Sequence, residues 1–356
     1  CGFIGSNLAR HLVKSGAHVT IIDSMLPIYG GNFANISDIS SMVNLNISDV
    51  RDEHAMSHLI QGQDYLFNLA GQTSHIDSMN DPRSDLEINV TAQLSILEAA
   101  RKLNPQVRIV FASTRQLYGK PQYLPVDETH PIVPVDINGI HKLAGEGYHM
   151  LYNKVYGIPT TCLRLTNTYG PGMRVKDARQ TFLGIWIKQI LSGEVIKVFG
   201  DGEQQRDFNY VDDVVDALIL SATREKAIGQ VLNLGSNEVI SLRKLADQLV
   251  QINGSGKWEL IPFPPDRKAI DIGDYYGDWG GLFGRVMSSQ WSTNGSVFSC
   301  KVEVLAKGNN VFQKILDNSK PNKQMYSMPS RPADNIGKYV DATTKDKDGS
   351  LDIRTH

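Results

Sequence analysis

Short hydrophobic runs recur along the first 170 residues and predict β-strands. Four of them are nearly continuous in apolar and β-branched residues, which is typical of strands buried on both faces of a parallel sheet. These runs are the segments 18–23, 65–71, 108–114 and 160–170.

Stretches of helical periodicity separate the predicted strands. Residues 6–16, 90–104 and 137–157 repeat apolar positions every three or four residues, and the first and last of these stretches end in glycine, a common helix stop. Regular alternation of strands and helices predicts an α/β fold with a doubly wound parallel sheet of Rossmann type over residues 1–170.

The pattern changes twice further along the chain. Residues 171–278 mix turns with helical stretches, and we expect a smaller α+β region there that binds substrate. Residues 279–356 have no clear period and no recognisable chemistry, so they stay unassigned.

Composition excludes several classes of protein. With 41% hydrophobic and 21% charged residues in 356, the chain can bury a large core, and its net charge of −2 gives no attraction to nucleic acid or an anionic membrane. No apolar run reaches the roughly 20 residues of a membrane span. The cysteines Cys1, Cys162 and Cys300 are too far apart for a metal motif, so we expect no metal, no disulfide framework and a cytoplasmic location.

The first residues carry half of a glycine-rich phosphate-binding motif. Gly2 and Gly5 have G-x-x-G spacing before a helix, and Asp23 ends the next strand. Glycine lets the backbone approach a pyrophosphate, the helix N-terminus stabilises its charge, and the carboxylate accepts hydrogen bonds from a ribose. The pattern predicts dinucleotide binding, and Asp23 favours NAD because it would repel the 2′-phosphate of NADP. We expect the first strand and first glycine of the motif to precede Cys1.

Residues 1–278 resemble the extended short-chain dehydrogenases/reductases, in the nucleotide-sugar epimerase/dehydratase group that includes UDP-glucose 4-epimerase. The resemblance rests on many matches in order, among them "GFIGSNLARHL" (2–12), "NLAGQTSHIDSMNDP" (68–82), "FASTRQLYG" (111–119), "LRLTNTYGPG" (163–172) and "GDGEQQRDFNYVDDVVDAL" (200–218). It implies a nucleotide-diphosphate sugar as the substrate.

The resemblance also implies roles for individual residues. The predicted NAD site comprises Gly2, Phe3, Ile4, Gly5 and Asp23 around the adenosine half, Asp49 and Val50 beside the adenine, Leu69, Ala70, Gly71 and Asn89 along the channel, and Lys142 at the nicotinamide ribose. The predicted substrate residues are His75, Thr114, Asn167, Arg206 and Arg267, with Thr114 hydrogen-bonding the reacting hydroxyl. The two arginines suit a diphosphate, because a guanidinium pairs bidentately with phosphate oxygens.

The sequence departs from the family after Thr114. Relatives that dehydrate or decarboxylate sugars carry acidic residues there, whereas this chain has Arg115 and Gln116. Neither side chain is a carboxylate, so the usual dehydration or decarboxylation is disfavoured. An epimerase-like or simple oxidoreductase pocket remains.

The second departure concerns the general base. Asn138 stands where the family has the tyrosine of Tyr-x-x-x-Lys, and an amide cannot take a proton from a sugar hydroxyl. Three residues could replace the base, and we rank Lys142 first, His141 second and His75 third. Alternatively, the protein binds NAD and a sugar nucleotide without turnover.

Relatives commonly form dimers through the two helices that correspond to residues 90–103 and 141–157. By this analogy we expect a homodimer.

Overall fold

The computed structural model describes residues 1–177, 181–236 and 239–278, together with two short strands near the end of the chain. Those strands, β12 (Thr343–Lys345) and β13 (Leu351–Ile353), pair antiparallel. The rest of the unassigned segment 279–356 lies outside the described residues.

Four parallel strands form the main sheet, in the order β3-β4-β5-β9. They are β3 (Tyr65–Asn68), β4 (Arg108–Thr114), β5 (Thr160–Leu165) and β9 (Val231–Leu234). Their side chains are mostly buried, as the continuous apolar runs predicted, because helices cover both faces.

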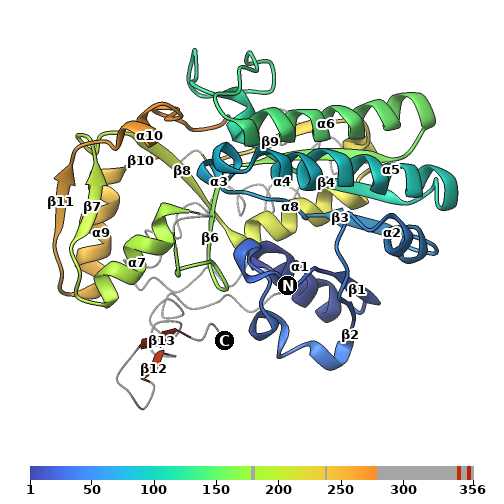
Figure 1. Ribbon diagram of the computed structural model, residues 1–356, viewed down its shortest axis with the longest axis horizontal. Coiled ribbons are helices and arrows are strands. Elements are labelled where there is room, and N and C mark those ends of the chain that lie inside the picture. Colours follow the sequence, from blue (N-terminus) through green and yellow to red (C-terminus); the bar gives the residue numbers. More distant parts are fainter. Residues whose placement is uncertain (178–180, 237–238, 279–342, 346–350, 354–356) are drawn as a thin grey trace, which may run out of the picture.

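Two helices lie on each face of this sheet (Figure 1). On one face are α5 (Ala92–Leu103) and α6 (Ile137–Tyr156), and on the other are α1 (Phe3–Lys14) and α8 (Val211–Thr223). Asp136 caps the start of α6 by accepting a hydrogen bond from Gly139 N, and Gly157 ends it in the left-handed conformation. The predicted α/β fold of Rossmann type is confirmed.

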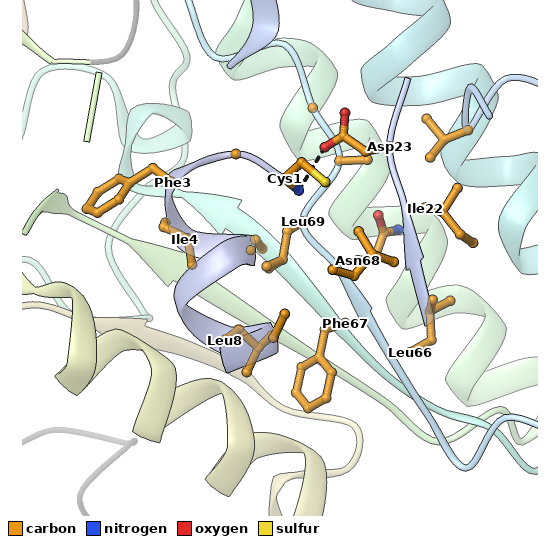
Figure 2. Close-up of a pocket in the computed structure, with 18 of the residues that line it drawn as sticks. Cys1, Phe3, Ile4, Leu8, Ile22, Asp23, Leu66, Phe67, Asn68 and Leu69 are labelled. Carbon is orange, nitrogen blue, oxygen red and sulfur yellow. Dashed lines mark hydrogen bonds and ion pairs between the residues drawn. The ribbon is translucent and has the colours of Figure 1, made fainter. Parts of the chain in front are cut away.

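A second parallel pair, β1 (Val19–Ile22) and β2 (Val43–Asn46), extends the layer beyond β3. In the part of the chain that the structure describes, no backbone ladder joins β1 to β3. The apolar side chains of Leu8, Leu66 and Phe67 lie around the space between them (Figure 2).

The remaining strands build a smaller region beside the main sheet. β8 (Gln205–Tyr210) pairs with β6 (Asn167–Tyr169) in parallel and with β10 (Val239–Ser241) antiparallel, while β7 (Ile196–Phe199) pairs with β11 (Trp258–Ile261). The helices of this region are α7 (Phe182–Leu191), α9 (Leu242–Asn253) and α10 (Pro265–Lys268).

Short helices fill the connections. They are α2 (Glu53–Leu59), α3 (His75–Asn80), α4 (Pro82–Leu86), a π-helical turn at Glu87–Thr91, and the 3₁₀ turns Pro27–Tyr29, Phe33–Ile36, Ser40–Met42, Arg115–Tyr118 and Glu225–Ala227. None of the described helices is long and apolar enough to span a membrane.

The chain does not divide between the two regions at one point. The run predicted at 160–170 is broken at Thr166, so that β5 joins the main sheet and β6 joins the smaller one. Further along, α8 packs against the main sheet and β9 pairs with β5, although both lie within residues 171–278. The first sheet is therefore completed by the later part of the chain.

A buried ion pair links α6 to β5 of the main sheet. The guanidinium of Arg164 on β5 donates two hydrogen bonds to the carboxylate of Glu146, at 2.5 and 3.0 Å. Ser113 on β4 donates a third hydrogen bond to Glu146, and the Arg164 guanidinium also bonds the Tyr118 hydroxyl. Both charged side chains are only 5% exposed, so the cost of removing each charge from water is offset mainly by the other charge.

Candidate functional site

A cavity of about 1020 Å³ fills the space between β1 and β3 along the length of both strands and continues past the carboxyl ends of β3 and β4. One end lies between α1, β1 and β3, where Ile4, Leu8 and Leu69 line it (Figure 2). The other end reaches Thr114 after β4 and Asn167 on β6. Ligands of open α/β sheets bind at this edge.

The N-terminus of α1 opens into this cavity. Gly2 is the N-cap residue of the helix in an extended conformation, and Phe3, Ile4 and Gly5 follow it along the cavity wall. Twelve residues of helix place a partial positive charge at this end, which suits a pyrophosphate.

Asp23 lies beside this helix end, at the carboxyl end of β1. Its Oδ1 accepts a hydrogen bond from Met25 N at 2.7 Å, and its Oδ2 lies 3.0 Å from the amino group of Cys1 (Figure 2). Asp49 and Val50, which follow β2, line the same end of the cavity. The residues predicted for the adenosine half of NAD are therefore gathered at one place.

Gly71 leaves room for the next part of the channel. A Cβ atom added there would lie 2.8 Å from Lys142 Nζ and 3.0 Å from Asn89 Oδ1, so a side chain would close the space. Leu69 and Ala70 precede Gly71 along the cavity. Asn89 lies behind this wall, fully buried, and its Oδ1 has no hydrogen-bond partner among the described residues. The absence of a side chain at Gly71 therefore keeps the channel open between the helix N-terminus and Lys142, as a bound dinucleotide would require.

Lys142 is the most perturbed base in the cavity. Its ammonium donates to Ala112 O at 3.2 Å and lies 5.0 Å from the centre of the Phe111 ring. Burial lowers the pKa of Lys142 to about 8, although the charge of Asp85 opposes the shift. A substantial fraction of the amine is therefore neutral near physiological pH and able to accept a proton.

Asn138 also lines the cavity, and its amide is held in place. Its Nδ2 donates to Gln72 O at 2.8 Å and to Asp85 Oδ2 at 3.1 Å. Asp85 is fully buried, and its other oxygen lies 2.6 Å from His141 Nδ1. His141 does not line the cavity. Its side chain contacts Asp85 instead.

His75 faces the cavity at the start of α3. Its Nδ1 lies 2.9 Å from Asp136 Oδ2, an ion-pair distance, in a direction that does not complete a regular hydrogen bond. Gln116 donates to the same oxygen at 2.8 Å. Burial alone would raise the pKa of Asp136, but His75, the Gly139 amide and Gln116 together lower it, so this carboxylate stays ionised beside the ring.

Thr114 and Arg115 end the cavity on the substrate side. Thr114 Oγ1 accepts a hydrogen bond from Gln116 N, which caps the 3₁₀ turn that follows β4. Arg115 Nη2 donates to Asn167 Oδ1 at 3.1 Å. The predicted substrate residues His75, Thr114 and Asn167 therefore lie in the same cavity as Lys142.

The two arginines predicted for the diphosphate lie outside the residues that line this cavity. Arg206 is buried; it donates to the carbonyls of Gln205 and Gly273, and its Nη2 lies 3.9 Å from Asp271 Oδ1. Arg267 packs over the Phe199 ring. Their role toward a diphosphate stays a prediction.

Sequence reasoning missed three buried carboxylates that organise the site. Asp85 holds Asn138 and His141, Asp136 holds His75 and Gln116, and Asp207 lies behind Arg115. Only Asp136 had a readable signal, because an aspartate directly before a helical stretch is a typical N-cap. In the described ranges no group of histidine, cysteine and acidic side chains is arranged to hold a metal ion.

Comparison with known proteins adds the family. Residues 1–235 match the NAD dependent epimerase/dehydratase family. The chain is 32% identical over 271 residues to UDP-N-acetyl-alpha-D-glucosaminuronate decarboxylase of Bacillus cytotoxicus (74% of this chain, 81% of the relative). It is 31% identical over 246 residues to UDP-glucose 4-epimerase of Mycolicibacterium smegmatis (68% and 77%).

Solved structures agree with this match. UDP-glucuronic acid 4-epimerase of Bacillus cereus, solved with UDP-glucuronic acid and NAD, superposes with a TM-score of 0.71 at 26% identity, covering 87% of this chain and 96% of that one. These matches bear out the predicted resemblance, the Rossmann-type fold, the enzyme class and NAD as the cofactor. The chain belongs to the NAD-dependent epimerase/dehydratase family.

Proposed function

We propose that this protein is an NAD-dependent nucleotide-sugar epimerase-like oxidoreductase with an altered general base. The observation that carries the proposal is the cavity that joins the helix N-terminus at Gly2 to Thr114, Asn138 and Lys142. The relatives that support it act, by their names, on sugars linked to UDP. When bound, NAD accepts a hydride from a sugar carbon and returns it.

Lys142 is the base in this proposal. Its neutral amine takes the proton of the sugar hydroxyl while Thr114 orients that hydroxyl, and the same proton returns when the hydroxyl is restored. A positively charged nicotinamide bound beside Lys142 would lower the pKa of the lysine further, since two like charges in a buried site repel each other. Asn138 supplies orientation only.

His75 is the second candidate for the base. It lines the cavity and is oriented by Asp136, whereas His141 is held by Asp85 away from the cavity. We therefore place His75 ahead of His141, which reverses the order that the sequence suggested.

The direct test uses turnover. The protein with NAD and a panel of UDP- and dTDP-sugars is followed by absorbance near 340 nm and by NMR of the products. Transient NADH and an epimerised sugar support the proposal. Absence of both, with every sugar and with NAD bound, would contradict it and favour the alternative, a catalytically impaired protein that binds NAD and a sugar nucleotide. Formation of a 4-keto-6-deoxy or a reduced product would identify the other alternative, a dehydratase or reductase.

Replacement of Asn138 by tyrosine distinguishes the first two possibilities. We expect Asn138→Tyr to lower turnover and stability, because it removes the amide that donates to Gln72 O and buried Asp85. An unsatisfied buried carboxylate costs about 1–3 kcal/mol or more. Turnover and thermal unfolding are measured together, with Asn138→Ala to separate loss of the amide from gain of the phenol. Activity that arises only in Asn138→Tyr would show that the natural protein is a binder.

Cofactor preference is tested at Asp23. We expect Asp23→Asn to weaken NAD binding about tenfold and to narrow the preference over NADP, because hydrogen bonds from the ribose to a charged acceptor are worth about 1.5–3 kcal/mol. Calorimetry with NAD and NADP measures both effects. Asp38→Asn, which removes an exposed carboxylate paired with Arg10, is the matched control. Equal affinities of wild type and Asp23→Asn for both dinucleotides would exclude this role.

We also propose a homodimer in the cytoplasm. Leu103 on α5 and Leu151 and Val155 on α6 are apolar and about half exposed on neighbouring helices, as the packing of a second copy requires. Both described cysteines are unpaired thiols, consistent with a reducing compartment. A monomer in sedimentation at micromolar concentration, unchanged by Leu151→Glu, would exclude the dimer.

A further inference from the structure

One positively charged group in the cavity is not used by the chemistry proposed above. Arg115 lines the cavity directly after Thr114. Its Nη2 bonds the Asn167 amide, and its guanidinium stacks on the Tyr275 ring, with 4.8 Å between the guanidinium carbon and the ring centre. Its Nη1 is buried and has no hydrogen-bond partner within the described ranges. A charged donor left unsatisfied in a buried place is costly unless a ligand completes it.

Among the residues that the structure describes, no carboxylate lies within ion-pair distance of this guanidinium. Among the described ion pairs within 4 Å, Arg206 is matched to Asp271, and Arg115 has no acidic partner. Asp207 acts on Arg115 only through space. Its Oδ2 is already engaged by the amides of Ser236 and Gly277, and burial raises the pKa of Asp207 to about 6. Asp207 therefore compensates the charge of Arg115 without a hydrogen bond to its Nη1, and an anionic ligand in the cavity would supply that missing acceptor.

The location of Arg115 indicates which part of the substrate carries that anion. It is adjacent in sequence to Thr114, which is expected to bond the reacting hydroxyl of the sugar, and both residues line one cavity with Lys142. A guanidinium fork matches a carboxylate with two parallel hydrogen bonds, whereas a neutral sugar hydroxyl leaves its charge uncompensated.

We propose that Arg115 is a specificity-determining residue that binds a carboxylate on the sugar, so that the preferred substrate is a nucleotide-linked uronic acid. This inference rests on the proposed function and narrows its substrate class.

The test compares two ligands that differ only at the sugar C6 position, UDP-glucuronic acid and UDP-glucose. Binding to the NAD-loaded protein is measured by calorimetry for wild type, Arg115→Met and Arg115→Lys, with UDP as a third ligand. Arg108→Met, which removes an arginine paired with Glu225 at the far end of β4, is the matched control. Thermal unfolding of every variant shows that it is folded.

We expect wild type to prefer the uronic acid. Arg115→Met should lose about 10- to 100-fold in affinity for UDP-glucuronic acid and little for UDP-glucose or UDP, since one charge-assisted bidentate contact is removed. Arg115→Lys, which keeps the charge but not the fork, should fall between wild type and Arg115→Met.

Four results would overturn the inference. Equal losses for all three ligands would assign Arg115 to the diphosphate. Unchanged selectivity with lowered stability would mean that Arg115 is satisfied by Asp207 through a small side-chain movement. Binding and turnover of UDP-glucose with no preference for the uronic acid would reject the inference and leave the proposed function intact, whereas failure of both sugars to bind would reject the two together.

Discussion

Lys142→Met is expected to lower turnover by about 10²–10⁴-fold, the typical contribution of a general base. The substitution removes the buried amine that lies beside the Ala112 carbonyl in the cavity and keeps a side chain of similar length. Initial rates at saturating NAD and sugar nucleotide measure the effect. Lys102→Met, which removes an exposed lysine paired with Glu98, is the control and should leave the rate unchanged.

The pH profile identifies the base independently of the rate. If the neutral amine of Lys142 accepts the proton, kcat/KM of the wild type rises with pH, and the midpoint of the rise lies at or below about 8, the pKa of this residue without cofactor. The rise should disappear in Lys142→Met. A rise that survives this substitution but is lost in His75→Asn would assign the base to His75 instead.

The same shift makes stability depend on pH. The folded state holds Lys142 with a pKa of about 8, whereas an unfolded lysine has a pKa of about 10.4. Between these values the unfolded chain binds more protons, so the free energy of unfolding rises as the pH increases from 8 toward about 10.4. Lys142→Met should flatten this part of the curve in urea denaturation.

Arg164→Met is expected to destabilise the protein by about 3–5 kcal/mol, because it leaves Glu146 buried without its counter-ion. Ser113 alone would still donate to that carboxylate. Urea denaturation followed by circular dichroism measures the change. The double variant Arg164→Met, Glu146→Leu should recover much of the loss, since it removes both charges together.

A surface ion pair provides the contrast. Arg101→Met breaks a pair with Glu98 that has similar distances but is 36% and 30% exposed, so the denaturation midpoint should stay much closer to that of wild type. Equal losses in Arg101→Met and Arg164→Met would show that burial of the Glu146–Arg164 pair does not determine its contribution.

The sequence predicted those elements that local pattern controls. The segment 108–114 forms β4 over that same range, and the helical stretch 137–157 forms α6 with Gly157 as its cap. The break at Thr166 was not readable, because residues 160–170 have continuous β propensity and only pairing with two different sheets separates them. For the same reason, the return of β9 to the main sheet required tertiary structure.

The site was predictable where a motif has a fixed spacing and unpredictable where it depends on distant contacts. Gly2, Gly5 and Asp23 come together as their spacing indicated. The pairing of His75 with Asp136, sixty-one positions along the chain, left no trace in either local sequence. From the sequence, Arg115 mattered only because it stands where relatives have an acidic residue. That its Nη1 is buried without a hydrogen-bond partner among the described residues is known only from the structure.

The interruption at Thr166 has a mechanical consequence. Thr114 is the register partner of Leu165 at the end of β5, and Asn167 begins β6 two residues later. No flexible linker separates the group expected at the reacting hydroxyl from the first strand of the smaller region. The short connection fixes the distance between Thr114 and Asn167 in the protein without ligand. Binding therefore costs little conformational entropy at these two residues. We expect the two sheets to bind the sugar without moving relative to each other, rather than to close around it.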